Sequence, residues 1–437
     1  MKVVGLITEY NPFHNGHKYH IDEAKRISGA DYVVIVMSGS FVQRGAPALM
    51  DKYQRTEMAL LLGADLVLEL PTCYATSSAE YFALGAVSLL HKLGIVDEIC
   101  FGSECGDVTI LTELAHILLD EPKEFKDVLS IKIKEGNTYP VARMEAIKAL
   151  YPTYYDTILT HPNNILGIEY IKALISLKSN MKALTITRKT ASYHSKDLSL
   201  GEGQKISSAT AIRRALFDNK ELKSVEQHLP LEVYQIMKEK YLKSFPVIED
   251  DFSLLLQYKL QYETIDSLAS YVDITPDLAN RIYKLPIYNR SISDYSMEIK
   301  TKQWTLTRIN RCLIHILLNH KKERFHQYNS DKDNNSDNDS DIINSDNSST
   351  NTNPNSYTQY ARILGVKKES SHLIRQIQKH EMIPVITKVA DAKNQLNETG
   401  YQMLMDDIHS THLYNQMVYS KYGTSLKNEY QRGIILI

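Results

Sequence analysis

The sequence is poor in cysteine and in long apolar runs, and both shortages narrow the class of protein. Its four cysteines (Cys73, Cys100, Cys105 and Cys312) form no C-x-x-C pair and have no histidine at zinc-ligand spacing. A disulfide framework or a structural metal site is therefore not expected. No stretch approaches the roughly 20 apolar residues of a membrane span, and the N-terminus lacks a secretory signal. These features predict a cytoplasmic protein.

The composition is that of an ordinary globular protein, with 43% hydrophobic and 23% charged residues. The 437 residues allow two or three domains. Residues 329–356 hold six aspartates and one lysine among Asn, Ser and Thr, a local charge of −5. The segment 329–357 is therefore predicted to be a disordered insertion. The rest of the chain carries a net charge of +3, the difference between −2 and −5, which permits a nucleic-acid partner without requiring one.

Short apolar runs alternate with amphipathic segments over the first 105 residues, which predicts an α/β fold with a parallel sheet. The expected strands are 3–7, 32–37, 66–70, 98–101 and, much later, 183–187. One expected helix begins near residue 17, and two others cover 52–62 and 78–93. Ligands of such sheets bind beyond the carboxyl ends of the strands, so the loops after Ile7, Met37 and Phe101 should converge on a site.

Helical patterns dominate beyond residue 220, with expected helices at 231–240, 250–260, 264–269, 276–283 and 297–318. We therefore predict a catalytic, ATP-binding region over residues 1–220. A mainly helical C-terminal region over 221–437 is expected to bind RNA.

The clearest chemical signal is the segment 11–17, Asn-Pro-Phe-His-Asn-Gly-His, between the first strand and the first helix. The first N–H groups of a helix are unpaired and attract anions, and Gly16 leaves the backbone accessible to a phosphate. His14 and His17 can both donate to a phosphate under nucleophilic attack, where fixed donors lower the barrier. The alternative is a capped loop with incidental imidazoles. The placement between strand and helix favours the catalytic interpretation.

H-x-G-H after a first strand resembles the signature of the nucleotidylyltransferase superfamily, which implies a Rossmann-like domain and a nucleoside triphosphate substrate. The segment 206–213, Ile-Ser-Ser-Ala-Thr-Ala-Ile-Arg, resembles the second signature of that superfamily with one extra residue. Ser207 and Ser208 would cap a helix, and Arg213 would neutralise the β- and γ-phosphates. A plain helix cap is the alternative for this segment.

Several longer motifs narrow the resemblance. Thr8-Glu9-Tyr10 departs from the usual superfamily run before the first histidine. Together with this departure, the segments 37–45, 101–104, 162–167 and 362–365 resemble the tRNA(Met) cytidine acetate ligase family. The resemblance covers nearly the full length apart from the Asn/Asp/Ser-rich insertion.

This resemblance implies that ATP activates acetate as acetyladenylate with release of pyrophosphate. The acetyl group would then pass to N4 of the wobble cytidine of elongator tRNA(Met). Mg²⁺ is expected with ATP, although no carboxylate pair marks its site. Two other functions stay open, a conventional adenylyltransferase acting on a phosphorylated small molecule and a non-catalytic RNA-binding protein.

The resemblance also implies an ATP site, with His14 and His17 as the catalytic residues. Its members are Ile7, Thr8, Glu9, Tyr10, Asn11, Pro12, Phe13, His14, Asn15, Gly16, His17, Lys18, Tyr19, His20, Gly102, Asn163 and Arg188. Asn163 offers an amide for a ribose or base edge, and Arg188 can stack on adenine or pair with phosphate. A turn, a helix cap and a solvated strand end are the alternatives for Gly102, Asn163 and Arg188. Gln43 and Arg44 could meet acetate, phosphate or RNA, or lie in an ordinary exposed loop.

A helix over residues 303–315 would place Trp304, Arg308, Arg311 and His315 on one face. Lys300 and Lys302 extend this positive charge. We predict that Lys300, Lys302, Trp304, Arg308 and Arg311 contact tRNA through phosphates and a stacking indole. The alternative is a solvated basic face with Trp304 partly in the core.

Overall fold

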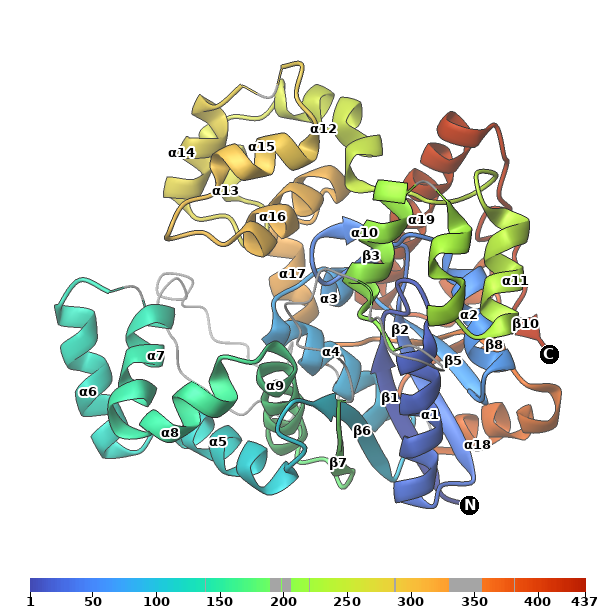
Figure 1. The fold of residues 1–437 in the computed structure, drawn as a ribbon, viewed down its shortest axis with the longest axis horizontal. Helices are drawn as coiled ribbons and strands as arrows, with labels where there is room; N and C mark the ends of the chain where they lie inside the picture. Colours follow the sequence, from blue (N-terminus) through green and yellow to red (C-terminus); the bar gives the residue numbers. More distant parts are fainter. Residues whose placement is uncertain are drawn as a thin grey trace.

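The computed structural model describes residues 1–137, 139–188, 198, 206–219, 221–286, 288–329, 356–380 and 382–437. A largely parallel sheet lies at the centre, with one helical lobe above it and another to one side (Figure 1). The strands are β1 (Val3–Thr8), β2 (Tyr32–Ser38), β3 (Phe41–Val42), β4 (Ala46–Pro47), β5 (Leu66–Leu70), β6 (Glu98–Ser103), β7 (Lys182–Thr187), β8 (Ala361–Val366), β9 (Val385–Ile386) and β10 (Ile435–Leu436). The five strands predicted from the sequence are confirmed, with ends that differ by at most two residues.

The main sheet has the order β10-β8-β5-β2-β1-β6-β7, and β9 pairs with β8. The strands from β5 to β7 along this order run parallel, so their carboxyl ends meet at one edge. β8 pairs antiparallel with β5 and extends the sheet on that side. The predicted boundary near residue 220 stays a prediction, and strands from both sides of it share this sheet.

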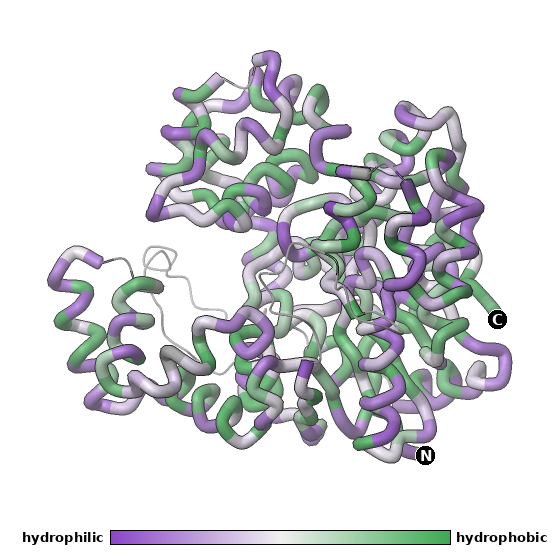
Figure 2. Tube along the Cα trace, viewed as in Figure 1, coloured by the Kyte–Doolittle hydropathy of each residue, from purple (hydrophilic) through white to green (hydrophobic). Residues whose placement is uncertain are grey.

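Helices cover both faces of the sheet. The α-helices in the described residues are α1 (Asn15–Ser28), α2 (Lys52–Leu61), α3 (Thr72–Ala75), α4 (Ala79–Lys92), α5 (Val108–Asp120), α6 (Lys123–Lys134), α7 (Tyr139–Leu150), α8 (Pro152–Tyr154), α9 (Pro162–Ser176), α10 (Ala209–Asn219), α11 (Leu231–Lys240), α12 (Ser253–Leu260), α13 (Ile265–Ala269), α14 (Pro276–Lys284), α15 (Ile292–Ile299), α16 (Leu306–Leu318), α17 (Lys322–Asn329), α18 (His372–His380) and α19 (Glu398–Tyr422). Alternating strand residues enter two cores: Val34 and Val36 pack towards α4 and α9, and Val33 and Ile35 towards α1 and α2. Hydrophilic and hydrophobic segments alternate along the helices of both lobes, as amphipathic packing requires (Figure 2).

The upper lobe, α12 to α16, has its own core of residues such as Leu256, Leu268 and Leu313. The single helix predicted over 297–318 is wrong, because α15 ends at Ile299 and α16 begins at Leu306. Thr305 caps α16 by accepting a hydrogen bond from the Arg308 N–H. This cap fixes the start of α16 after the segment that holds Lys300, Lys302 and Trp304.

The predicted disordered insertion lies, apart from its ends, outside the described residues. Its two ends are close together, because the Tyr357 N–H donates to the carbonyl of Tyr328 at 2.9 Å. A long loop can be inserted between such ends with little effect on the fold. Within the described part of the chain, no helix has both the length and the apolar character to cross a membrane.

Candidate active site

Two cavities meet at the carboxyl edge of the sheet. The larger has a volume of about 620 Å³ and the smaller about 330 Å³. They share the lining residues Glu9, His14, His17, Arg44, Asn163 and Arg188. Glu9 after β1, Gln43 and Arg44 after β2, and Gly102 near the end of β6 line these walls, so the chain segments after Ile7, Met37 and Phe101 converge as predicted.

Hydrogen bonds to backbone N–H groups fix the rings of His14 and His17 at the start of α1. The Nδ1 atom of His14 accepts from the Gly16 N–H at 3.0 Å, and that of His17 accepts from the His14 N–H at 3.3 Å. The two rings stack with centroids 3.7 Å apart. A nitrogen that accepts carries no proton, so each neutral ring holds its proton on Nε2. Each histidine therefore has an Nε2–H that can donate to a ligand.

The electrostatic surroundings keep these rings neutral. Burial, reinforced by Arg188 and Arg213, lowers the pKa of His14 to about 3. Burial and the neighbouring His14 also hold the pKa of His17 well below its usual range. At neutral pH the two rings can therefore donate hydrogen bonds to a ligand without adding charge.

The loop between β1 and α1 is tied to distant parts of the chain. The Asn11 side-chain oxygen accepts from the Leu49 N–H at 2.7 Å, and the Asn11 carbonyl accepts from Arg213 Nη1 at 2.6 Å. Tyr10 has a positive φ of 48° and is fully buried. A left-handed tyrosine is held only where its surroundings determine the backbone, so this loop is preorganised.

Arg55 of α2 clamps two strand ends and is absent from the residues predicted from the sequence. Its guanidinium donates to the carbonyls of Glu9 at 2.7 Å and Ser38 at 2.9 Å, and also to that of Gly39. The side chain is fully buried. Arg55 lies on an ordinary amphipathic helix, so no local pattern in the sequence identifies this role.

Gly102, Asn163 and Arg188 come together as expected for one site. Arg188 Nη1 lies 3.3 Å from Asn163 Oδ1, and a Cβ on Gly102 would lie 3.2 Å from Arg188 Cγ. Glu104, also missed by the site prediction, accepts from Asn163 Nδ2 at 2.5 Å. Asn164 is occupied elsewhere, since its amide accepts from two backbone N–H groups and donates to a carbonyl. The geometry thus favours Asn163 over Asn164 as the ligand-facing amide.

The second signature lies beside the smaller cavity. Ser208 Oγ accepts from the Ala211 N–H at 3.1 Å at the start of α10, consistent with the predicted cap. Ser208, Thr210 and Arg213 line the cavity. This end of the site therefore presents a cation and a helix start, which suit an anionic group.

The upper lobe contributes to both cavities, which the sequence did not indicate. Thr307 lines the larger cavity and Asn310 the smaller one. α16 packs directly on the loop after β2, where a Cβ on Gly45 would lie 2.2 Å from the Arg311 backbone nitrogen. The same loop meets the residue that follows β1, because the Gln43 N–H donates to the Glu9 carboxylate at 2.8 Å.

Most of the predicted ATP-site residues line one cavity or both. These are Ile7, Thr8, Glu9, Asn11, His14, Gly16, His17, Tyr19, His20, Gly102, Asn163 and Arg188. The other five support the loop or lie outside the walls: Tyr10 and Phe13 are fully buried, Pro12 is buried, Asn15 donates to the Gln227 carbonyl, and Lys18 pairs with Asp22.

The five residues predicted to contact tRNA differ in burial and in their hydrogen-bond partners. Trp304 is 7% exposed in the core of the upper lobe, so its indole has little surface for stacking. Arg308 donates to the Asp273 carbonyl at 3.1 Å, and Arg311 pairs with the Asp273 carboxylate at 2.9 Å. Lys300 and Lys302 are exposed in the segment before α16. The tRNA role of these five residues stays a prediction, best supported for the two lysines.

Within the described residues, no group of three or more His, Cys, Asp or Glu side chains is arranged to hold a metal ion.

Solved structures similar to this chain share its whole architecture. A crystal structure of Thermotoga maritima TmcAL bound with alpha-thio ATP (form II) is 28% identical, with a TM-score of 0.86 and coverage of 100% of both chains. The apo form I structure of the same protein has a TM-score of 0.87.

Sequence relatives agree with the structures. A tRNA(Met) cytidine acetate ligase of Thermoanaerobacter sp. (strain X514) is 39% identical over 416 residues, 95% of each chain. That of Acetivibrio thermocellus is 36% identical over 443 residues, 100% of each chain. The family described as HIGH Nucleotidyl Transferase matches residues 1–337 and 342–429. The chain therefore belongs to the HIGH nucleotidyl transferases and, among them, to the tRNA(Met) cytidine acetate ligase family.

Proposed function

We propose that the protein couples ATP to the acetylation of elongator tRNA(Met) at N4 of its wobble cytidine. In the first step, an acetate oxygen attacks the α-phosphorus of ATP. An O–P bond forms, the bond between the α-phosphorus and the bridging oxygen breaks, and pyrophosphate leaves. The acetyladenylate that results has AMP as a good leaving group, which free acetate lacks.

The paired histidines are the centre of this proposal. Negative charge grows on the equatorial oxygens of the α-phosphate during attack, and two fixed Nε2–H donors favour that charge more than the ground state. Because both rings are already neutral with a proton on Nε2, neither has to change its protonation state before it donates to the phosphate. His14 is the N-cap of α1, so the positive end of the helix dipole lies in the same region.

The two cavities suit the two ends of ATP. Apolar and aromatic side chains of the larger cavity, among them Phe101, Leu166 and Tyr170, suit adenine. Asn163 and Arg188 line both cavities, as the two histidines do. Arg213 and the start of α10 suit the β- and γ-phosphates. Mg²⁺ bound to these phosphates would neutralise charge on the leaving pyrophosphate.

The second step transfers the acetyl group. The cytidine N4 atom attacks the acetyl carbonyl, a C–N bond forms, the C–O bond to the phosphate breaks, and AMP leaves with the electron pair. N4 loses one proton, and no base is assigned to it. Arg44 and Gln43 lie at the wall of the larger cavity, where acetate or the acceptor would approach.

The observation that carries this proposal is the convergence of the histidine pair, Arg188 and Arg213 around the two joined cavities. The test supplies the protein with ATP, labelled acetate and bulk tRNA, followed by digestion of the RNA. Label in N4-acetylcytidine supports the ligase. AMP transfer without acetate would instead identify a conventional adenylyltransferase, and neither product would leave a non-catalytic RNA-binding protein.

A further inference from the structure

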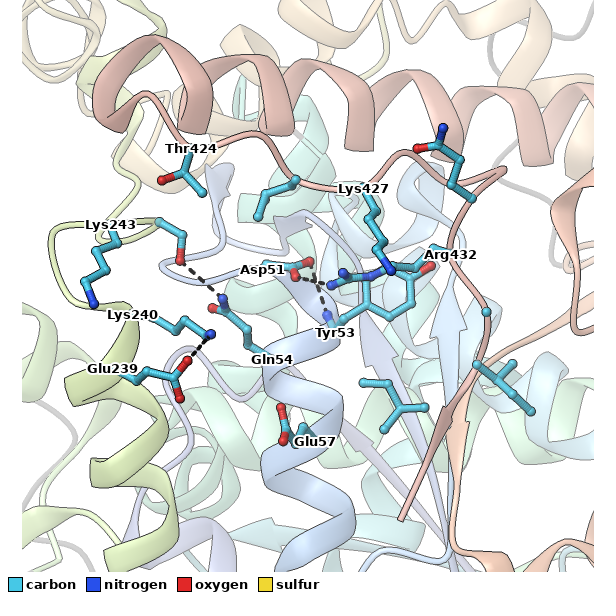
Figure 3. Close-up of a pocket in the computed structure, with 16 residues that line it drawn as sticks. Asp51, Tyr53, Gln54, Glu57, Glu239, Lys240, Lys243, Thr424, Lys427 and Arg432 are labelled. Atoms are coloured by element: carbon cyan, nitrogen blue, oxygen red, sulfur yellow. Dashed lines mark hydrogen bonds and ion pairs between the residues drawn. The ribbon is translucent and has the colours of Figure 1, made fainter.

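A third cavity, of about 590 Å³, lies apart from the two described above (Figure 3). One face of α2, the end of α11 with the turn after it, and the segment 424–435 form its walls. We call it the C-terminal cavity. It shares no lining residue with the larger or the smaller cavity.

Four basic and three acidic side chains line the C-terminal cavity: Lys240, Lys243, Lys427, Arg432, Asp51, Glu57 and Glu239. Two of the carboxylates are already paired, Asp51 with Arg432 at 2.9 Å and Glu239 with Lys240. Lys243 and Lys427 are exposed, and no hydrogen bond or ion pair within the described residues engages their ammonium groups. In Figure 3, Lys427 points from the C-terminal segment towards Arg432, and Lys243 stands on the side of α11. The cavity therefore has cations on two sides.

A buried amide oxygen in the wall lacks a partner. Gln54 is 8% exposed, and its Nε2 donates to Ser244 Oγ at 3.2 Å. Its Oε1 has no hydrogen-bond partner among the described residues. An unpaired buried acceptor is unfavourable, so a donor on a bound molecule would be favoured at this point.

The same wall offers a planar surface. The guanidinium of Arg432 lies 4.2 Å from the centroid of the Tyr53 ring, and the Arg432 side chain keeps 25% of its surface exposed. Asp51 holds this guanidinium in place from the side. Nucleobases stack on such planes, and single-stranded RNA is commonly recognised in this way.

We propose that the C-terminal cavity binds one unpaired nucleotide of the tRNA substrate, a second anchoring point outside the reaction site. Its base stacks on Arg432 and donates an amino or imino hydrogen to Gln54 Oε1. The ammonium groups of Lys243 and Lys427 meet the flanking phosphates. This inference rests on the proposed function, because it names a further contact with the same RNA.

The cavity lies close enough to the reaction site for one RNA to reach both. Leu49 and Val247 line the smaller cavity, whereas Asp51 and Ser244 line the C-terminal cavity. The Val247 N–H donates to the Leu49 carbonyl at 3.1 Å, so the two segments form one shared wall. Two or three residues of about 3.8 Å each separate the cavities along this wall.

The test measures the affinity of the full-length protein for an elongator tRNA(Met) transcript, together with acetate-dependent ATP–pyrophosphate exchange. We expect Arg432→Ala to weaken tRNA binding roughly ten-fold or more, as loss of a stacking partner does. Lys243→Glu with Lys427→Glu should weaken it further and reduce its salt dependence by about one counterion per lysine. Exchange should stay at the wild-type rate in every variant.

Lys238→Glu is the matched control, because Lys238 is an exposed lysine of α11 that does not line the cavity. Equal weakening by Lys238→Glu and Lys243→Glu would overturn the inference in favour of general charge attraction. Unchanged tRNA affinity in both Lys243→Glu/Lys427→Glu and Arg432→Ala would also overturn it. Failure of exchange in the wild type would instead contradict the proposed function. The two lysines are exposed, so their variant keeps the test valid even if Arg432→Ala unfolds.

Discussion

His14 and His17 each accept a backbone N–H through Nδ1 while their rings stack 3.7 Å apart. The cap of α1 and the proposed catalytic pair are therefore one structure. The hydrogen bonds that start the helix also fix which ring nitrogen carries the proton. Local folding thus sets the chemical state of the site.

The two roles of His14 can be separated by substitution. His14→Asn keeps an oxygen that can accept from Gly16 but removes the Nε2–H. We expect its exchange rate to fall about 100- to 1,000-fold while its melting temperature stays near that of the wild type. His14→Ala should lose the same activity and also about 1 kcal/mol of stability. Exchange at the wild-type rate in His14→Asn would contradict the donor role.

Stability should fall as the pH drops below about 6.5. Burial lowers the pKa of His14 to about 3, of His20 to about 4 and of His320 to about 3, so the unfolded chain binds more protons than the folded one in this range. Each buried neutral histidine contributes fully to stability above pH 6.5, and this contribution is lost as the pH falls towards 3. At pH 5 the loss of unfolding free energy is on the order of 2 kcal/mol per histidine. Urea unfolding between pH 5 and 8 measures it.

His320→Phe tests whether burial holds a histidine neutral at a position outside the reaction site. Both ring nitrogens of His320 lack a hydrogen-bond partner among the described residues. The substitution should remove about one proton from the pH dependence of unfolding between pH 4 and 6. An unchanged slope would mean that His320 is not held neutral by burial.

Gly45→Ala should disturb the contact between the loop after β2 and α16. Gly45 has a φ of 73°, and an added Cβ would overlap the backbone of Arg311 at 2.2 Å. Gly29 has a similar φ of 63° with nothing within 4 Å, so Gly29→Ala isolates the backbone strain of roughly 1 kcal/mol. We expect a clearly larger drop in melting temperature, and a loss of exchange, for Gly45→Ala alone. Similar melting temperatures would show that the contact can relax.

The lysines and arginines before and within α16 should behave differently when their charge is reversed. Lys300→Glu with Lys302→Glu should weaken tRNA binding without lowering the melting temperature. Arg311→Glu should lower the melting temperature, because it replaces an ion pair with a carboxylate against the partly buried Asp273. Filter binding and thermal melts compare the two. Unaltered tRNA affinity in the lysine variant would remove this surface from the RNA path.

Much of the site was predictable because its signals are local. The five strands show as apolar runs, and His14, Gly16 and His17 lie within four residues of one another. Arg55, Thr307 and Asn310 were not predictable, since their roles depend on contacts with segments far away in the chain. The helix over 297–318 was predicted too long because an apolar and basic pattern continues through a break set by Thr305. Trp304 was placed on a surface because the helical periodicity was extended to it, whereas it lies in the segment before α16 and packs into the core of the upper lobe.

The antiparallel strand β8 gives the order of synthesis a role in folding. The edge of β5 stays unpaired until the roughly 290 residues between Leu70 and Ala361 have been synthesised, because only then can β8 pair with it. At about 5–20 residues per second, that delay is roughly 15 to 60 s. During this time the nascent chain exposes the unpaired edge of a strand that is apolar except for Glu69, the kind of surface that pairs with other chains. The strands from β1 to β7 are made first, yet their sheet is completed only when β8 follows much later in the chain.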